Sequence, residues 1–247
     1  MTHRRILALS GADTRKFLQG IVTNDVGELD HGAVYTALLT PQGKFLCDFF
    51  LIPEGDSVLV DVAEEYADAL TKRLTMYKLR ADVQVETTDR KVARGLGPTP
   101  EGAFADPRHE GLGWRAYDGR EGDETIDWDA LRVAYVIPET GIELTPDTFI
   151  LEAGFERLSG VNFKKGCYVG QEVTARMHHK TTLRKGLVQV VIDGSAPVGT
   201  PLLTEDGKEA GTLFTQSGGR AIAHLRFDRA NGPMTAGDAT VTYRPQG

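Results

Sequence analysis

A single cysteine stands between two glycines in the segment 164–172, which reads KKGCYVGQE. The chain has only one other cysteine, Cys47, and no CxxC spacing, so the sequence predicts neither a disulfide framework nor a zinc motif. Lys164 and Lys165, which precede Gly166, favour a reactive thiolate at Cys167, because nearby positive charge lowers the pKa of a cysteine. A buried, unreactive thiol is the alternative, and spacing alone leaves both open.

Hydrophobic spacing predicts a helix over residues 167–178. Val169, Val173 and Met177 recur at i, i+4 and i+8 and would face the core. Cys167 would then lie in the first turn, where unpaired N–H groups and the helix dipole stabilise a thiolate. The sequence therefore predicts a partly exposed cysteine at a helix N-terminus.

The same region is locally basic. Residues 164–185 contain one acidic residue, Glu172, and six basic residues, Lys164, Lys165, Arg176, Lys180, Arg184 and Lys185. The segment therefore has a formal charge of +5, although the whole chain has a net charge of −7. This charge favours an anionic ligand beside Cys167, although a solvated basic face is the alternative. His178 and His179 are adjacent and would point about 100° apart on a helix, so no metal site is predicted. The net charge argues against stable nucleic-acid binding.

The elements that must position this segment follow an α+β pattern. Strands are predicted at residues 6–9, on both sides of the turn Pro41-Gln42-Gly43, at 57–62 and at 81–87. A helix should follow Ser10, which begins an S-x-x-D start signal. Tyr66, Leu70, Leu74 and Tyr77 form the stripe of an amphipathic helix. Strands and helices in this order indicate α+β rather than a doubly wound sheet.

Two composition changes indicate the domain organisation. Residues 97–125 are rich in Gly, Pro and charge, which predicts a surface loop joining two lobes. A helix is expected from about Asp127 to the residues before Pro138, and a second helix at Thr145-Pro146. From Leu183 onward, short strands with Gly-rich turns predict a small antiparallel barrel. The expected division is an α+β body over 1–179 and a barrel over 180–247.

The sequence gives no targeting or membrane signal. The apolar run near the N-terminus covers only residues 6–9, which is too short for a signal peptide. No apolar run approaches the roughly 20 residues of a membrane span. We therefore expect a soluble, cytoplasmic protein.

The segment 160–176, GVNFKKGCYVGQEVTAR, resembles the signature of the YgfZ family, folate-binding relatives of the glycine-cleavage aminomethyltransferase (T-protein). Residues 11–26 and 37–46 resemble the N-terminal motifs of that family. The motif K-G-C-Y-x-G-Q-E is matched without a gap by Lys165, Gly166, Cys167, Tyr168, Gly170, Gln171 and Glu172. The resemblance implies a multi-lobed, ring-like T-protein fold with a C-terminal antiparallel β-barrel and a central tetrahydrofolate site. It also implies a role in iron–sulfur cluster assembly or repair, and so in cluster-dependent enzymes that include tRNA-modifying ones.

The resemblance also implies roles for individual residues. Cys167 corresponds to the signature thiol, proposed to act near folate or a transient iron–sulfur cluster. Trp128, ten residues before Pro138, corresponds to a tryptophan that contacts folate, and Arg132 lies one turn further on. The remaining candidate folate contacts are Asn24, Gln171 and Tyr77.

Three functions stay open at this point. The first is a tetrahydrofolate-binding protein that serves iron–sulfur client or assembly proteins without a demonstrated reaction. The second is a one-carbon (aminomethyl) transferase in which Asp48, with Asn24 and Asp25 nearby, orients the folate. Where T-proteins carry paired aspartates this chain keeps only Asp48, which argues against glycine cleavage. The third is an interaction module in which Cys167 is structural.

Overall fold

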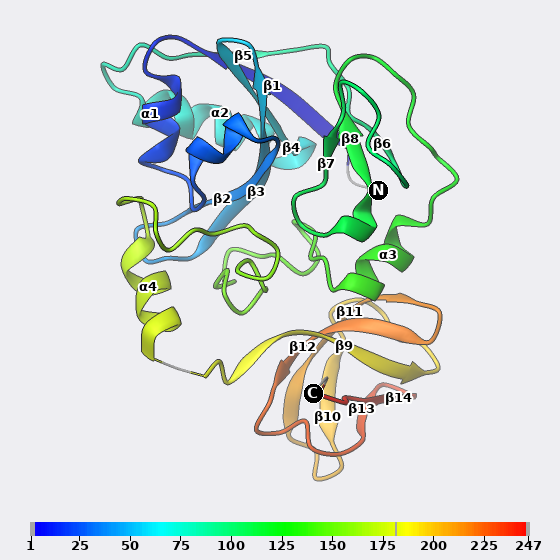
Figure 1. Cartoon of the computed structure of the whole chain (residues 1–247). Helices are drawn as coiled ribbons and strands as arrows, with labels where there is room; N and C mark the ends of the chain where they lie inside the picture. Colours follow the sequence, from blue (N-terminus) through cyan, green and yellow to red (C-terminus); the bar gives the residue numbers. More distant parts are fainter. Residues whose placement is uncertain (1–2, 181, 246–247) are drawn as a thin grey trace. The chain divides into compact units, whose positions relative to one another are not determined.

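The computed structural model describes residues 3–180 and 182–245 (Figure 1). The chain divides into two compact units, each built from two stretches of sequence. The first unit comprises Met1–Ile126 and Phe155–Ala175, and the second comprises Asp127–Gly154 and Arg176–Gly247. Residues 127–154 are thus grouped with the barrel, whereas the sequence assigned them to the body. Among the described residues, no helix is both long and apolar enough to cross a membrane.

The first unit contains a five-stranded antiparallel sheet in the order β2-β3-β4-β1-β5. Its strands are β1 (Arg4–Ser10), β2 (Val34–Leu39), β3 (Phe45–Glu54), β4 (Ser57–Ala63) and β5 (Gln84–Thr87). The predicted hairpin at Pro41-Gln42-Gly43 is confirmed, because β2 and β3 pair directly across it.

One face of this sheet is covered by α1 (Thr14–Gln19), the 3₁₀ helix η1 (Val26–Asp30) and α2 (Glu64–Tyr77). Leu70 and Leu74 of α2 are buried in the same core as Leu7 and Leu9 of β1, which confirms the predicted stripe. Each fully buried leucine stabilises the fold by about 1.5–3 kcal/mol. Because side chains alternate along a strand, the residues between these core positions point to the opposite face of the sheet.

The predicted surface loop over 97–125 is wrong for residues 104–117. These residues form β7 (Phe104–Ala105), the 3₁₀ helix η2 (Glu110–Leu112) and β8 (Trp114–Ala116). Together with β6 (Ala93–Gly95) they make a three-stranded sheet in the order β6-β8-β7. Arg115 on β8 is only 2% exposed, so this region contributes to the interior of the first unit.

The second unit begins with the predicted helix, α3 (Trp128–Tyr135). The side chain of Asp127 accepts a hydrogen bond of 2.9 Å from the N–H of Ala130 and caps the helix. The helix predicted at Thr145-Pro146 is absent; the backbone there forms turns. Thr148 closes one such turn: its hydroxyl accepts from the Thr145 N–H, and its N–H donates to the Thr145 carbonyl, both at 2.9 Å.

A closed antiparallel barrel completes the second unit and confirms the predicted C-terminal barrel. Its strand order is β10-β11-β12-β9-β14-β13. Leu202, Leu213 and Leu225 are fully buried in its interior. The strands are β9 (Lys185–Asp193), β10 (Pro201–Thr204), β11 (Glu209–Ser217), β12 (Arg220–Arg226), β13 (Met234–Ala236) and β14 (Ala239–Thr242).

Candidate functional site

Cys167 is exposed, as predicted, but it does not lie in a helix. The helix α4 (Gln171–Lys180) begins four residues later, so the predicted N-terminal position is wrong. Gly170 explains the difference, because its φ of 84° lies in the left-handed region and interrupts the helical backbone. A Cβ at Gly170 would also lie 2.4 Å from the carbonyl oxygen of Thr40, so the signature segment passes very close to the β2–β3 turn.

The chain before Cys167 is fastened to the loop between α1 and β2 by backbone and side-chain hydrogen bonds. The N–H of Asn162 donates to the carbonyl of Thr23 at 3.1 Å. The hydroxyl of Thr23 donates to the carbonyl of Gly160 at 2.7 Å. The amide of Asn24 donates to the carbonyl of Ser159 at 2.6 Å, so this predicted folate contact is also a structural residue.

Lys165 extends this attachment to within two residues of the cysteine. Its ammonium donates to the carbonyl of Gln19 at 2.8 Å and to the carbonyl of Val22 at 2.5 Å. Burial lowers the pKa of Lys165 to about 8, and Asp25 opposes that shift. Lys165 therefore holds the signature segment in place while Cys167 stays accessible.

The second cysteine, Cys47, has the opposite environment. It lies in β3 with 4% of its surface exposed. Burial raises the pKa of the Cys47 thiol, the neighbouring Asp48 raises it further, and Arg73 only partly opposes them. Cys167 is thus the accessible thiol of the chain.

Asp48, the second catalytic candidate, is buried beside Tyr35 on the sheet face opposite α1 and α2. The Tyr35 hydroxyl donates to Oδ2 of Asp48 at 2.9 Å. Burial raises the pKa of Tyr35 well above its usual value, and Asp48 raises it further, so the hydroxyl stays protonated. The ring of Phe155 stacks on Tyr35 with centroids 5.1 Å apart, and the Asn24 amide donates to the Tyr35 carbonyl at 2.9 Å. Tyr35 therefore lies between two of the predicted site residues.

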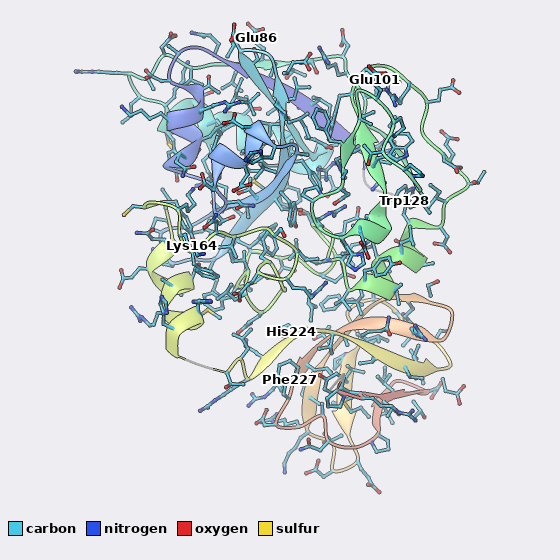
Figure 2. The ribbon with its side chains drawn as sticks, viewed as in Figure 1. Glu86, Glu101, Trp128, Lys164, His224 and Phe227 are labelled. Atoms are coloured by element: carbon cyan, nitrogen blue, oxygen red, sulfur yellow. The ribbon has the colours of Figure 1, made fainter. Side chains whose placement is uncertain are left out.

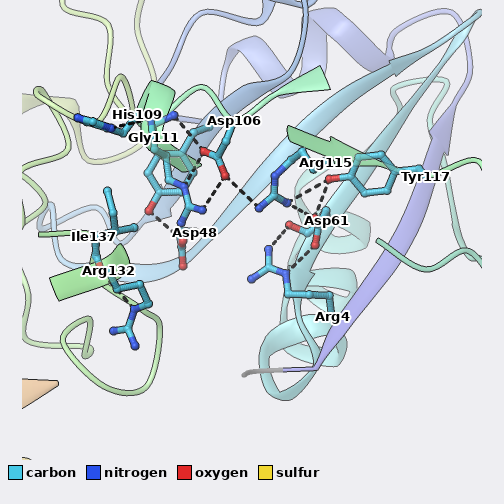
Figure 3. A network of polar contacts seen from close by, with 12 residues as sticks. Arg4, Asp48, Asp61, Asp106, His109, Gly111, Arg115, Tyr117, Arg132 and Ile137 are labelled. Atoms are coloured by element: carbon cyan, nitrogen blue, oxygen red, sulfur yellow. Dashed lines mark hydrogen bonds and ion pairs between the residues drawn. The ribbon is translucent and has the colours of Figure 1, made fainter. Parts of the chain in front are cut away.

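A network of buried charges continues along this face (Figure 3). The carboxylate of Asp61, on β4, accepts from Arg4 Nε at 2.6 Å, from Arg115 at 2.5 Å and from the Tyr117 hydroxyl at 2.7 Å. Burial raises the pKa of Asp61, but the attraction of Arg4 and Arg115 outweighs it, and the net pKa is lowered. The network joins the three-stranded sheet to the five-stranded sheet.

Asp106 and Arg108 complete the network. Arg108 forms two hydrogen bonds with the Asp106 carboxylate, at 2.9 and 2.8 Å. The guanidinium of Arg115 lies 3.5 Å from the ring centroid of Phe50, and that of Arg108 lies 4.8 Å from it, both within cation–π range. Sequence reasoning missed these residues, although the alternation in Trp114-Arg115-Ala116-Tyr117 could have indicated a strand.

Two of the predicted folate contacts, Trp128 and Arg132, lie in the second unit. Trp128 is partly buried at the start of α3 (Figure 2). Arg132, one turn later, is 7% exposed and ion-pairs with Glu143 and, at 3.0 Å, with Glu139. Its Nε also donates to the carbonyl of Ile137 at 3.2 Å. Arg132 therefore fastens α3 to the turn that follows, and a ligand would compete with these partners.

The other predicted contacts lie in the first unit. Gln171 begins α4, and its side-chain oxygen accepts from the N–H of Tyr168 at 3.2 Å. Tyr77 ends α2, where its hydroxyl accepts from Arg73 at 3.4 Å, and its ring packs against the core below the sheet. Among the predicted folate residues, only Trp128 and Arg132 belong to the second unit.

Comparison with known proteins gives four matches of interest. Residues 184–247 match the C-terminal β-barrel domain of CAF17. The mouse protein named iron–sulfur cluster assembly factor IBA57, mitochondrial, is 30% identical over 278 residues, covering 94% of this chain and 78% of that protein. The human protein of the same name is 30% identical over 276 residues with the same coverage. The solved structure of the glycine cleavage system aminomethyltransferase T from Bartonella henselae aligns with a TM-score of 0.74 at 15% identity, covering 97% of this chain and 82% of that one. The predicted T-protein-type fold is thereby confirmed.

Proposed function

The chain belongs to the IBA57 family of iron–sulfur cluster assembly factors, and we propose on this basis that it binds tetrahydrofolate and supports cluster assembly or repair. The observation that supports this proposal most directly is the accessible thiol of Cys167. It lies in a signature segment that hydrogen bonds of Lys165 and Asn162 hold in place. The enzymes that would receive or keep their clusters through this activity are cluster-dependent enzymes, including tRNA-modifying ones. The relatives' names place those proteins in mitochondria; a cytoplasmic location stays the prediction for this chain.

The number of thiols limits how a cluster would be held. Iron–sulfur clusters are usually bound by four cysteine thiolates. This chain has two cysteines, and the thiol of Cys47 is buried with a raised pKa. Cys167 could supply one thiolate, so the remaining ligands would come from a client or assembly protein. A cluster is therefore a cargo in transit rather than a resident cofactor.

The proposal of folate binding is supported by the T-protein fold and by Trp128, an aromatic residue of the kind that stacks on flat ligands and one that is not fully buried. The basic segment 164–185 would favour the glutamate tail of folate. If so, polyglutamylated folate binds more tightly than the monoglutamate form, and the difference shrinks as salt screens the charges. Equal affinity for the polyglutamylated and monoglutamate forms at low salt would show that the glutamate tail does not bind this segment.

A one-carbon transferase is the second candidate, favoured by the single carboxylate of Asp48 in a buried site. The hydrogen bond from Tyr35 holds this carboxylate in one orientation, as orienting a folate amine would require. Incubating the purified protein with a one-carbon folate adduct separates the two proposals. Consumption of the adduct, lost in Asp48→Asn, favours the transferase, and binding without consumption favours the assembly factor.

Rescue of iron–sulfur enzyme activity in cells that lack the protein tests the main proposal. Cys167→Ser should fold and bind folate almost normally, because the side chain is exposed and the substitution is small. It should nevertheless fail to restore enzyme activity. Cys47→Ala, the matched control, removes the buried thiol and should restore it when expressed at equal level. Full rescue by Cys167→Ser would show that the thiol is not the working group.

A further inference from the structure

The C-terminal end of α2 leaves two large apolar side chains in solvent. Met76 is 59% exposed, and Leu79, just after the helix, is 86% exposed. Leu79 also has a φ of 48°, in the left-handed region that disfavours residues with a Cβ. Glycine is the usual residue after a helix in this conformation. Because the Leu79 side chain is not packed, the fold itself does not account for a leucine here.

The same end of α2 is strongly basic. Residues 72–80, KRLTMYKLR, contain four basic residues and no acid, in a chain of charge −7. Lys72 and Arg80 are exposed, and neither has an ion-pair or hydrogen-bond partner within the part of the chain that the structure describes. Asp68, one turn before Lys72, forms its ion pair with Arg5 and not with Lys72. Positively charged side chains near a helix C-terminus interact favourably with the helix dipole. This interaction accounts for the basic residues, but it does not account for the exposed apolar side chains.

We propose that the C-terminal end of α2 is a docking surface for an acidic amphipathic segment of a partner protein. This surface is formed by Lys72, Met76, Leu79 and Arg80. Lys72 and Met76 lie one turn apart on the same face of α2, so charge and apolar surface alternate along it. A partner with leucines between glutamates would cover both at once. A methionine suits such a surface because its flexible side chain adapts to different partners. The proposal does not depend on folate binding or on Cys167, so it can fail separately from the proposed function.

The decisive variant is Leu79→Gly in the full-length chain. Glycine relieves the left-handed strain, so the melting temperature should stay equal or rise. Affinity for a fluorescein-labelled peptide of Glu and Leu at helical spacing should nevertheless fall about tenfold or more, as expected for losing one buried leucine. Leu96→Ala is the matched control, because Leu96 is 44% exposed elsewhere in the first unit and should not affect peptide binding.

Charge reversal and alternative probes complete the test. Lys72→Glu with Arg80→Glu should weaken peptide binding and reduce its salt dependence, and a peptide with Ser in place of Leu should not bind. Unchanged peptide affinity in Leu79→Gly, or a lower melting temperature, would overturn the proposal. Binding to anionic phosphatidylserine vesicles but not to the peptide would also overturn it. So would self-association in sedimentation that Leu79→Gly abolishes, because the occupant would then be a second copy.

Discussion

Replacing Asp61 by Asn should destabilise the first unit strongly. The carboxylate is 0% exposed and accepts from Arg4, Arg115 and Tyr117. Asparagine keeps the shape but removes the charge and places an N–H₂ group against two guanidinium groups. Removing one partner of a buried ion pair costs about 3–5 kcal/mol. At about 2–4 °C per kcal/mol, the melting temperature should fall by roughly 6–20 °C.

The two tryptophans allow this loss to be measured in one unit. Trp114 lies on β8, next to Arg115, in the first unit, and Trp128 lies in the second. In a Trp128→Phe background, fluorescence during urea unfolding therefore reports the first unit alone. Asp118→Asn is the matched control, because Asp118 pairs with an arginine at the surface and should change little. A loss no larger than in this control would refute the assigned role of the network.

The same variant should change the acid limb of the stability curve. The pKa of Asp61 is lowered from its usual 3.8, since Arg4 and Arg115 outweigh the effect of burial. The native state therefore binds fewer protons than the unfolded state in this range. The stabilisation that ionised Asp61 gives the native state is therefore complete above the pKa of Asp61 in the unfolded chain. It is lost as the pH falls through the lower pKa of Asp61 in the folded chain. Urea midpoints measured from pH 5 downward should decline less steeply for Asp61→Asn than for the wild-type chain. Parallel declines would contradict this.

Three further outcomes follow from the site. A thiol reagent near pH 7 should modify Cys167 well before Cys47, because one is exposed and the other is buried with a raised pKa; equal rates would contradict the structure. Lys165→Ala should increase hydrogen exchange over the signature segment by removing two hydrogen bonds, whereas Lys164→Ala should not; mass spectrometry after deuterium labelling measures both. Trp128→Ala should weaken tetrahydrofolate binding, followed by fluorescence quenching or calorimetry, by about 1 kcal/mol or more, and unchanged affinity would remove this ring from the site.

Local patterns predicted the elements that are regular over their whole length. The stripe of α2 has one buried side, so its periodicity is visible in the sequence. The strand β4 is buried on both sides and was recognisable as a short, β-branched apolar run that follows a turn. The barrel strands were equally clear, because short alternating runs end at glycine-rich turns. The exposure of Cys167 also followed from its polar surroundings.

The features that sequence reasoning missed depend on contacts between distant residues. Arg115 looks like a surface residue until Asp61, 54 positions earlier, supplies its partner. The start of α4 was misplaced because Gly170 contacts the β2–β3 turn, which the hydrophobic stripe does not reveal. The role of Lys165 was likewise hidden, since its two acceptors are backbone carbonyls near α1. A pattern within one segment carries no information on such partners.

The attachment of the signature segment to the loop before β2 has a consequence for synthesis on the ribosome. Thr23 and Gly160, joined by a hydrogen bond, are 137 residues apart in the chain. Tyr35 and Phe155, whose rings stack, are 120 residues apart, so at about 5–20 residues per second Tyr35 waits roughly 6–24 s before Phe155 is synthesised. Residues 127–154, which belong to the other unit, are translated in between. The nascent chain therefore exposes an aromatic surface for many seconds, and we expect its yield to depend on chaperones that shield such surfaces until translation passes residue 160.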